Sequence, residues 1–168
     1  MKNLKIGIIS DTHDNLPLVD KVIDRLNQEK VEMVLHAGDY VAPFTILRFK
    51  KLKAKLVGVF GNNDGDHDFL KRRFAEVEGA EIRGSFAEVT IDGLKIALLH
   101  GDEEELLQSL INTECYDVVA HGHSHEAGAH NRGKTIVINP GEVCGYLSGK
   151  PTLALFDTKT REARIIQL

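Results

Sequence analysis

Short apolar runs alternate with segments of helical spacing through the first half of the chain. The runs Ile6–Ile9, Met33–His36 and Leu56–Phe60 are expected to form strands, and the first is apolar throughout, as in a strand buried on both faces. Helical spacing follows at residues 16–28 and again at about 70–77, and a short helix is expected between the second and third strands. This alternation predicts a parallel sheet built from strand–helix–strand units.

The second half of the chain has a different pattern. Phe86–Ile91 alternates between apolar and polar residues, Asp92-Gly93 is a strong turn signal, and Leu94–Leu99 completes a predicted hairpin. So many strands need a second apolar face to cover them, which predicts two packed sheets. The remaining strands are expected at Val118–Ala120, Thr135–Ile138, Leu153–Phe156 and Arg164–Ile166.

A helix is expected from about Glu103 to Glu114. Its acidic start, Asp102 to Glu105, could serve a metal or a partner, but negative charge at a helix N-terminus also complements the helix dipole, which is the simpler interpretation. The residues expected to face inward are Leu106, Leu107, Leu110 and Ile111.

Length and charge narrow the class of protein. With 168 residues, one domain is expected. The net charge of −4 argues against a protein that grips a nucleic-acid polymer, although metal ions could still bring in a small phosphate-bearing substrate. Cys115 and Cys144 lie far apart and are expected to be reduced thiols. The apolar run ending at Ser10 is too short to span a membrane and lacks a signal-peptide pattern, so a cytoplasmic protein is expected.

Five short polar motifs each follow a run expected to form a strand. Ligands of open α/β sheets bind outside the carboxyl ends of strands, so these motifs can converge although they are far apart in sequence. Singly, Gly-Asp and Gly-Asn are ordinary turn material, whereas His-x-His places two imidazoles on one side of an extended chain. The motifs are Asp11-Thr12-His13, Gly38-Asp39, Gly61-Asn62-Asn63-Asp64, His100-Gly101 and Gly122-His123-Ser124-His125.

Together the motifs place four of the eight histidines alongside Asp11 and Asp39. All of these groups are oxygen or nitrogen donors. A buried cluster of this kind would be costly without cations, because neighbouring carboxylates cannot all stay ionised unaided. The joint pattern therefore indicates a site for metal ions.

In this order, the five motifs resemble those of the calcineurin-like metallophosphoesterases. The chain length and the Asn139-Pro140-Gly141-Glu142 turn are similar to those of the small single-domain phosphodiesterases in that family. The resemblance covers nearly the whole chain. It implies an α/β fold with four layers, in which two central mixed sheets are flanked by helices, formed by one domain over residues 1–168.

The resemblance also implies a set of metal ligands and a reaction. Two divalent ions would share one carboxylate and one bridging hydroxide, and the hydroxide would hydrolyse a phosphodiester P–O bond. Without a thiolate ligand, Mn²⁺, Ni²⁺, Co²⁺, Fe and Zn²⁺ are all admissible, and Mn²⁺ is favoured. One ion would take Asp11, His13 and His125, the other would take Asn62, His100 and His123, and Asp39 would bridge both.

The chain departs from the family pattern at Asn63. Many relatives carry a histidine directly after the ligand asparagine, where it contacts the phosphate and helps the leaving group to depart. An amide can donate a hydrogen bond but cannot deliver a proton near neutral pH. Asn63 could still bind phosphate, or it could shape the turn with Asp64 and Gly65, and both alternatives stay open. His67 could supply the proton instead, although a solvated histidine at a helix start is the simpler interpretation.

The remaining cationic and imidazole side chains have simpler expected roles. His36 is expected to be hydrogen-bonded in the core or beside the site, His121 to lie near the site without binding metal, and His130 to lie on a surface loop. The run Lys71-Arg72-Arg73 is expected to form a solvated helix face rather than a substrate-binding patch.

Two rival functions remain. A phosphomonoesterase would use the same metal pair. A non-catalytic scaffold, like the retromer subunit that resembles this fold, would be free to lose motif residues, but all seven proposed ligands are present here. The sequence decides neither the substrate nor the oligomeric state, and a homo-oligomer stays an alternative.

Overall fold

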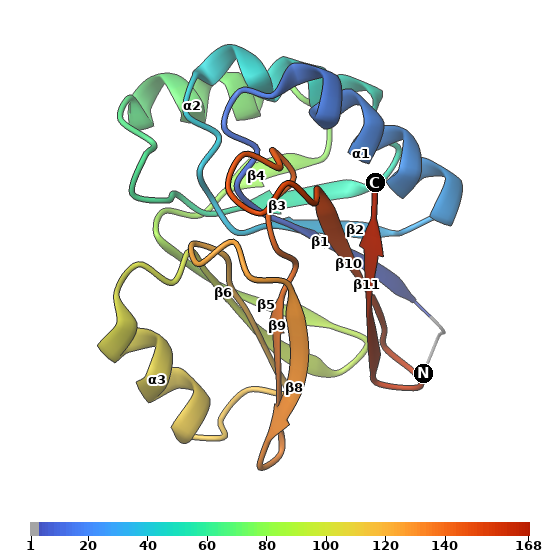
Figure 1. Cartoon of the computed structure of the whole chain (residues 1–168), viewed down its shortest axis with the longest axis vertical. Coiled ribbons are helices and arrows are strands. Elements are labelled where there is room, and N and C mark those ends of the chain that lie inside the picture. The colour runs from blue at the N-terminus through green and yellow to red at the C-terminus, as the bar shows by residue number, and fades with distance from the viewer. Residues whose placement is uncertain (1–3) are drawn as a thin grey trace.

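A computed structural model describes residues 4–168 and arranges them in four layers (Figure 1). Two sheets face each other in the centre. Helices α1 (Leu16–Glu29) and α2 (His67–Ala75), with the 3₁₀ helix η1 (Pro43–Lys51), cover the outer face of the first sheet. Helix α3 (Glu104–Asn112) covers the outer face of the second sheet. The predicted four-layer sandwich is therefore confirmed.

The first sheet has six strands in the order β11-β10-β1-β2-β3-β4. Strands β1 to β3 run parallel, as the strand–helix alternation predicted. Strand β4, which was not predicted, extends this parallel run, and β10 joins β1 in the antiparallel sense, so the sheet is mixed. The strands are β1 (Lys5–Ile9), β2 (Met33–His36), β3 (Lys55–Gly58), β4 (Ala80–Ile82), β10 (Thr152–Asp157) and β11 (Glu162–Gln167).

The second sheet has five strands in the order β5-β6-β7-β9-β8. Strands β6, β7 and β9 are parallel, and the two edge strands pair in the antiparallel sense. The predicted hairpin is confirmed with its bounds unchanged. The strands are β5 (Phe86–Ile91), β6 (Leu94–Leu99), β7 (Val118–Ala120), β8 (Gly128–Arg132) and β9 (Thr135–Asn139).

Strand β1 is buried on both faces, which explains its unbroken apolar run. Ile6 and Ile8 point into the layer between the sheets, where they join Leu98 and Val118 of the second sheet. Ile9 points to the opposite side and packs under the helices. A central strand of this kind fixes the position of the polar residues that follow it.

Two predicted details are wrong. Leu106 was expected to face inward but is 40% exposed, whereas Leu107 and Ile111, four residues apart on one face of α3, are buried. His130 was expected in a loop but lies on β8, where its side chain is exposed. Strand β8 pairs with β9 through its backbone and carries almost no apolar residues, so no alternating pattern indicates it.

The two cysteines are free thiols, as expected: Cys115 is exposed and Cys144 is buried. Among residues 4–168, no helix combines the length and the apolar character that a membrane crossing needs. The first three residues of the range predicted as one domain, 1–168, lie outside the described residues.

Candidate metal centre

The loops that follow β1, β2, β3, β6 and β7 meet at one edge of the sandwich. Backbone hydrogen bonds join them: Asp11 N donates to Gly38 O over 3.0 Å, and Gly122 N donates to His100 O over 2.8 Å. A third bond, from Cys144 N to Asp11 O, ties in the loop after β9. The five predicted motifs are therefore brought together as expected from the carboxyl ends of parallel strands.

Two glycines allow the turns to come up against carboxylates. A Cβ added to Gly61 would lie 2.2 Å from Asp39 Oδ1, and one added to Gly122 would lie 2.6 Å from Asp11 Oδ2. No side chain fits at either position. The Gly in each motif is thus required by close packing around the acidic groups.

Five residues of the motifs have left-handed backbone. Non-glycine residues seldom adopt this conformation, and such strain is concentrated at functional sites. The φ angles are 55° at Asp11, 39° at His13, 62° at Asp39, 68° at His123 and 60° at His125.

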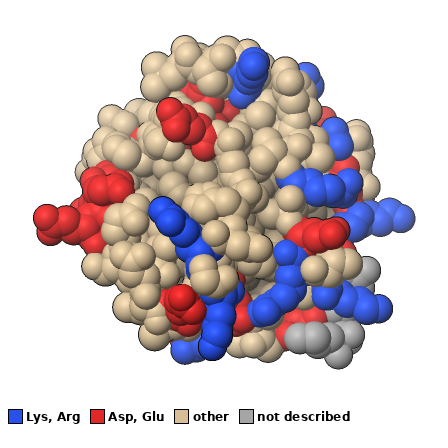
Figure 2. All heavy atoms as spheres, turned by 60° about the horizontal axis from the view of Figure 1, so that its bottom comes forward, with Lys and Arg blue, Asp and Glu red and all other residues tan. Residues whose placement is uncertain are grey.

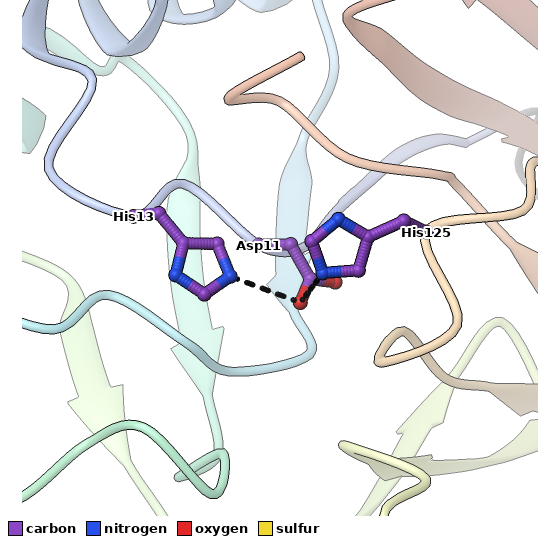
Figure 3. A group of neighbouring side chains, drawn as sticks. All are labelled: Asp11, His13 and His125. Atoms are coloured by element: carbon purple, nitrogen blue, oxygen red, sulfur yellow. Dashed lines mark ion pairs between the residues drawn. The ribbon is translucent and has the colours of Figure 1, made fainter. Parts of the chain in front are cut away.

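Asp11 lies between two imidazoles (Figure 3). Its Oδ1 atom is 3.6 Å from His13 Nε2 and 3.2 Å from His125 Nε2. The carboxylate of Asp11 is fully buried, whereas the two histidine side chains are slightly exposed. One oxygen and two nitrogen atoms therefore face a common point and could hold a cation.

A second group of donors surrounds Asp39. Its Oδ2 atom lies 3.3 Å from His100 Nε2 and 3.5 Å from His13 Nε2, so this carboxylate stands between the two groups. Asn62 Oδ1 and His123 Nδ1 lie 3.1 Å apart, and the rings of His123 and His100 are 5.1 Å apart. All seven predicted ligands thus lie around one continuous site.

The buried donors fit a cation better than they fit one another. His100 Nδ1 lies 2.8 Å from the carbonyl oxygen of Ala37, which can only accept, so the neutral ring has no proton on Nε2. Of five buried side-chain polar atoms without a hydrogen-bond partner in the described part of the chain, three belong to this site: Asp11 Oδ1, His13 Nε2 and His100 Nε2. Such atoms are costly to bury unless something binds them.

The carboxylates and imidazoles of the site shift one another's pKa values. Burial alone would lower the pKa of His100, but the adjacent carboxylate of Asp39 outweighs it and raises that pKa to about 8. Burial would raise the pKa of Asp39, but the adjacent imidazole of His100 and the hydrogen bonds from Asn63 lower it well below its usual range. The site therefore holds ionised carboxylates that attract positive charge.

Asp64 organises the loops beneath these ligands, whereas it was expected only to shape a turn. Its carboxylate accepts backbone N–H groups from Asp39, Tyr40, Val41 and Gly61 at 2.8–2.9 Å. The side chain is nearly fully buried. An aspartate three residues after the glycine of a turn, as in Gly61-Asn62-Asn63-Asp64, is the signal that could have indicated this role.

Glu142 is a second residue whose role was not predicted. Its Oε2 atom is 2.6 Å from His125 Nδ1. Burial would raise the pKa of Glu142, but hydrogen bonds from Cys144 and Ser148 outweigh it and lower that pKa to about 2, so the group is ionised at neutral pH. The Asn139-Pro140-Gly141-Glu142 turn contributed to the family resemblance without indicating a contact with a ligand histidine.

Asn63 is exposed, and its side chain contacts Asp39. Its side-chain amide donates to Asp39 Oδ2 over 2.8 Å. His67, the alternative proton donor, is exposed at the start of α2, where Asp66 caps the helix, and its ring stacks on Phe60 with centroids 3.8 Å apart. This environment agrees with a solvated histidine at a helix start.

The two other histidines near the site lie outside the donor groups. His36 is fully buried; its Nδ1 accepts from Gly38 N over 3.1 Å and its Nε2 lies 3.4 Å from Thr12 Oγ1, so its expected hydrogen-bonded role is confirmed. His121 is half-buried, with Nδ1 3.2 Å from Gly122 O.

On the face shown in Figure 2, most Lys and Arg side chains lie on the right half with Asp and Glu side chains among them, so they form no unbroken basic band, and acidic side chains lie at the left edge. Lys71 and Arg72 are exposed, and Arg73 pairs with Glu76 over 2.8 Å. The predicted solvated helix face agrees with these contacts. A polynucleotide-binding protein would instead concentrate basic residues on one surface.

Known proteins are similar to this chain in both sequence and fold. The chain is 44% identical to a phosphodiesterase of Methanocaldococcus jannaschii over 165 residues, which is 98% of this chain and 99% of that protein. It superposes on an archaeal phosphodiesterase structure with a TM-score of 0.94 at 44% identity, covering 98% of this chain and all of the other. The Vps29 protein of Chaetomium thermophilum has the same fold at 18% identity, with a TM-score of 0.72 over 98% of this chain and 96% of the other.

A family profile agrees with these similarities. Residues 4–161 match the calcineurin-like phosphoesterase superfamily domain. This match covers most of the chain and includes all five motifs. The chain therefore belongs to the calcineurin-like phosphoesterase superfamily.

Proposed function

We propose that this protein is a metal-dependent phosphodiesterase that hydrolyses a P–O bond of a small phosphodiester. The position of Asp39 carries the proposal. Its carboxylate lies between His13 and His100, whose Nε2 atoms are buried without hydrogen-bond partners in the described part of the chain. A carboxylate between two sets of nitrogen donors is the arrangement that a two-metal site requires. The near-full-length similarity to a phosphodiesterase supports the same reaction class.

The observed distances support the first half of the proposed ligand division. One ion would be held by Asp11, His13 and His125, whose donor atoms face one point. A second would be held by Asn62, His100 and His123, with Asp39 shared between both. Mn²⁺ is the proposed metal, and Ni²⁺, Co²⁺, Fe and Zn²⁺ suit the same oxygen and nitrogen donors.

When bound, two divalent ions would generate the nucleophile from water and neutralise the phosphoryl oxygens. The chain itself prepares the site. Ala37 O fixes the ring of His100 with Nε2 facing Asp39. Asn62 contributes a neutral oxygen, which limits the negative charge that a phosphate anion would meet. Asn63 holds the Asp39 carboxylate through two hydrogen bonds.

The scaffold alternative has less support. The likeness to Vps29 at 18% identity concerns the fold alone. A scaffold does not need buried imidazole nitrogens and a carboxylate oxygen without partners, which are costly to retain. The phosphomonoesterase alternative uses the same donors, and only an assay separates it from the proposal.

The proposal extends to the whole of residues 1–168 as one domain of this class. The two free thiols support a reducing, cytoplasmic compartment. Neither statement affects the chemistry of the site.

The deciding experiment is a metal panel on two substrates. The protein is stripped with a chelator, loaded with each divalent ion in turn, and assayed on bis(4-nitrophenyl) phosphate and 4-nitrophenyl phosphate. Hydrolysis is expected only with metal and faster on the diester. Faster hydrolysis of the monoester would favour a phosphomonoesterase, and no hydrolysis with any ion would leave the scaffold.

A further inference from the structure

Glu142 is a fully buried carboxylate that contacts a proposed ligand from behind. Its Oε2 atom lies 2.6 Å from His125 Nδ1, and within residues 4–168 its one ion-pair partner is this histidine. The Sγ atom of Cys144 donates to the same oxygen over 3.0 Å. A buried charge that pairs with an imidazole, rather than with Lys or Arg, needs an explanation beyond surface electrostatics.

The other oxygen of Glu142 anchors a loop. Oε1 accepts the backbone N–H groups of Leu147, over 3.0 Å, and of Ser148. The side chains of Tyr146 and Leu147 at the tip of this loop are exposed. A single carboxylate therefore joins the loop after β9 to the metal centre.

The contact fixes which nitrogen of His125 faces the site. Glu142 Oε2 already accepts from the Sγ atom of Cys144 and faces His125 Nδ1, so Nδ1 carries the proton and Nε2 of the neutral ring is left bare, 3.2 Å from Asp11 Oδ1. A carboxylate behind a histidine holds the ring in place and increases the basicity of its ligand nitrogen.

We infer that Glu142 is a positioning residue for the metal centre, holding His125 so that the ion on Asp11, His13 and His125 binds tightly. The inference rests on the proposed function. It assigns to Glu142 an effect on one ion only, because no described contact joins Glu142 to Asn62, His100 or His123.

A competing assignment uses the same atoms. His125, Glu142 and Cys144 lie close enough together to hold a cation themselves. However, the oxygens of Glu142 already accept from His125, Cys144, Leu147 and Ser148. A cation there would have to displace these donors, so the positioning role is favoured.

Calorimetric titration with Mn²⁺ tests the inference on metal-stripped wild type, Glu142→Gln and the control Cys144→Ala. Wild type is expected to bind two ions. In Glu142→Gln, one affinity is expected to fall by about 10–100-fold while the other is unchanged, since loss of a partner behind a ligand histidine has this typical effect. Cys144→Ala is expected to match wild type. Circular dichroism verifies that each variant is folded.

A second measurement does not depend on any variant. Two-bond ¹H–¹⁵N NMR of the metal-free wild type reports the tautomer of each histidine, and His125 is expected to carry its proton on Nδ1. A proton on Nε2, or wild-type affinities in folded Glu142→Gln, would overturn the inference. Loss of an ion in Cys144→Ala would instead assign the cation to Cys144. If wild type bound no Mn²⁺ at all, the proposed function itself would fail.

Discussion

Asn63 holds both oxygens of the Asp39 carboxylate, its backbone N–H at 2.9 Å from Oδ1 and its side-chain amide at 2.8 Å from Oδ2. The sequence left open whether Asn63 binds phosphate or shapes a turn. In this arrangement the amide is engaged with a proposed ligand, so contact with a phosphate would require it to leave Asp39. Neither role provides a proton for the leaving group.

Leaving-group dependence is the consequence of this arrangement. Without a general acid, diesters with good leaving groups such as nitrophenolate are expected to be cleaved far faster than alkyl esters. Asn63→His is expected to accelerate poor leaving groups by up to about 10²–10⁴-fold, the usual range for general acid catalysis, with little change for good ones. In Asn63→His, the rate for poor leaving groups should fall at high pH, where the new imidazole loses its proton.

The measurement is the slope of log rate against leaving-group pKa, with Asn63→Ala as the control that removes the amide without adding an acid. The slope is expected to be shallower for Asn63→His than for the other two proteins. Three equal slopes would show that the side chain at 63 does not face the leaving oxygen, or that His67 already supplies the proton.

Asp39→Asn is expected to leave the fold intact and to lower activity by more than about 100-fold. This exceeds the loss of about 10–100-fold that is typical when a residue supporting a metal ligand from behind is removed. The reason is that Asp39 Oδ2 faces His13 and His100 at once, so one lost charge weakens both proposed ion sites. Metal content by elemental analysis and turnover on a diester provide the measurement. Asp68→Asn, whose side chain is 91% exposed on α2, is the matched control and should behave as wild type. Two retained ions with wild-type turnover would exclude a bridging Asp39.

His123→Ala and His125→Ala are expected to lose different ions. His125 Nε2 faces Asp11, whereas His123 Nδ1 faces Asn62, so the two rings belong to different donor groups. Each variant should retain about one ion per chain and lose most of its activity. The exposed His130 on β8 provides a control, because His130→Ala removes an imidazole that belongs to neither donor group. A variant indistinguishable from His130→Ala would contradict the division of the pair.

The buried His36 is expected to make the stability of the fold depend on pH. Burial lowers the pKa of His36 from the ordinary 6.5 to about 3. Below pH 6.5 the unfolded chain therefore binds a proton that the folded chain does not, so stability falls as the pH falls towards 3. Between pH 7 and pH 5 this amounts to about 2 kcal/mol, at about 1.4 kcal/mol for each pH unit below 6.5.

Urea unfolding of the metal-free protein at pH 7 and pH 5 measures this effect. Neighbouring carboxylates raise the pKa values of His13 and His100 and so favour the folded state at low pH, which is why wild type must be compared with a variant. His36→Asn keeps an acceptor near Gly38 N and removes the titration. Its loss of stability over this interval should be smaller by about 2 kcal/mol, and parallel losses would refute the prediction.

Periodicity was sufficient for most of the fold because the predicted strands are buried and apolar. The run Met33–His36 and the hairpin Phe86–Ile91 with Leu94–Leu99 were predicted with their observed bounds. Strand β8 was missed because an exposed edge strand is stabilised by backbone pairing, which leaves no hydrophobic pattern. The convergence of the five motifs could be predicted because polar residues at strand ends share one edge of the sheets, whereas the seven proposed ligands within them came from the family resemblance. The contacts of Glu142 and Asp64 could not, since they depend on how distant loops approach one another.

The left-handed backbone of five site residues costs folding free energy that does not depend on metal binding. These residues are Asp11, His13, Asp39, His123 and His125. Each such residue opposes folding by about 1–2 kcal/mol, and this opposition acts whether or not an ion is present. The main chain is already arranged when an ion arrives, so binding need not reshape it. A glycine at Asp11 would relieve the strain while removing the donor. In these residues, the backbone conformation that places the metal donors therefore also lowers the stability of the fold.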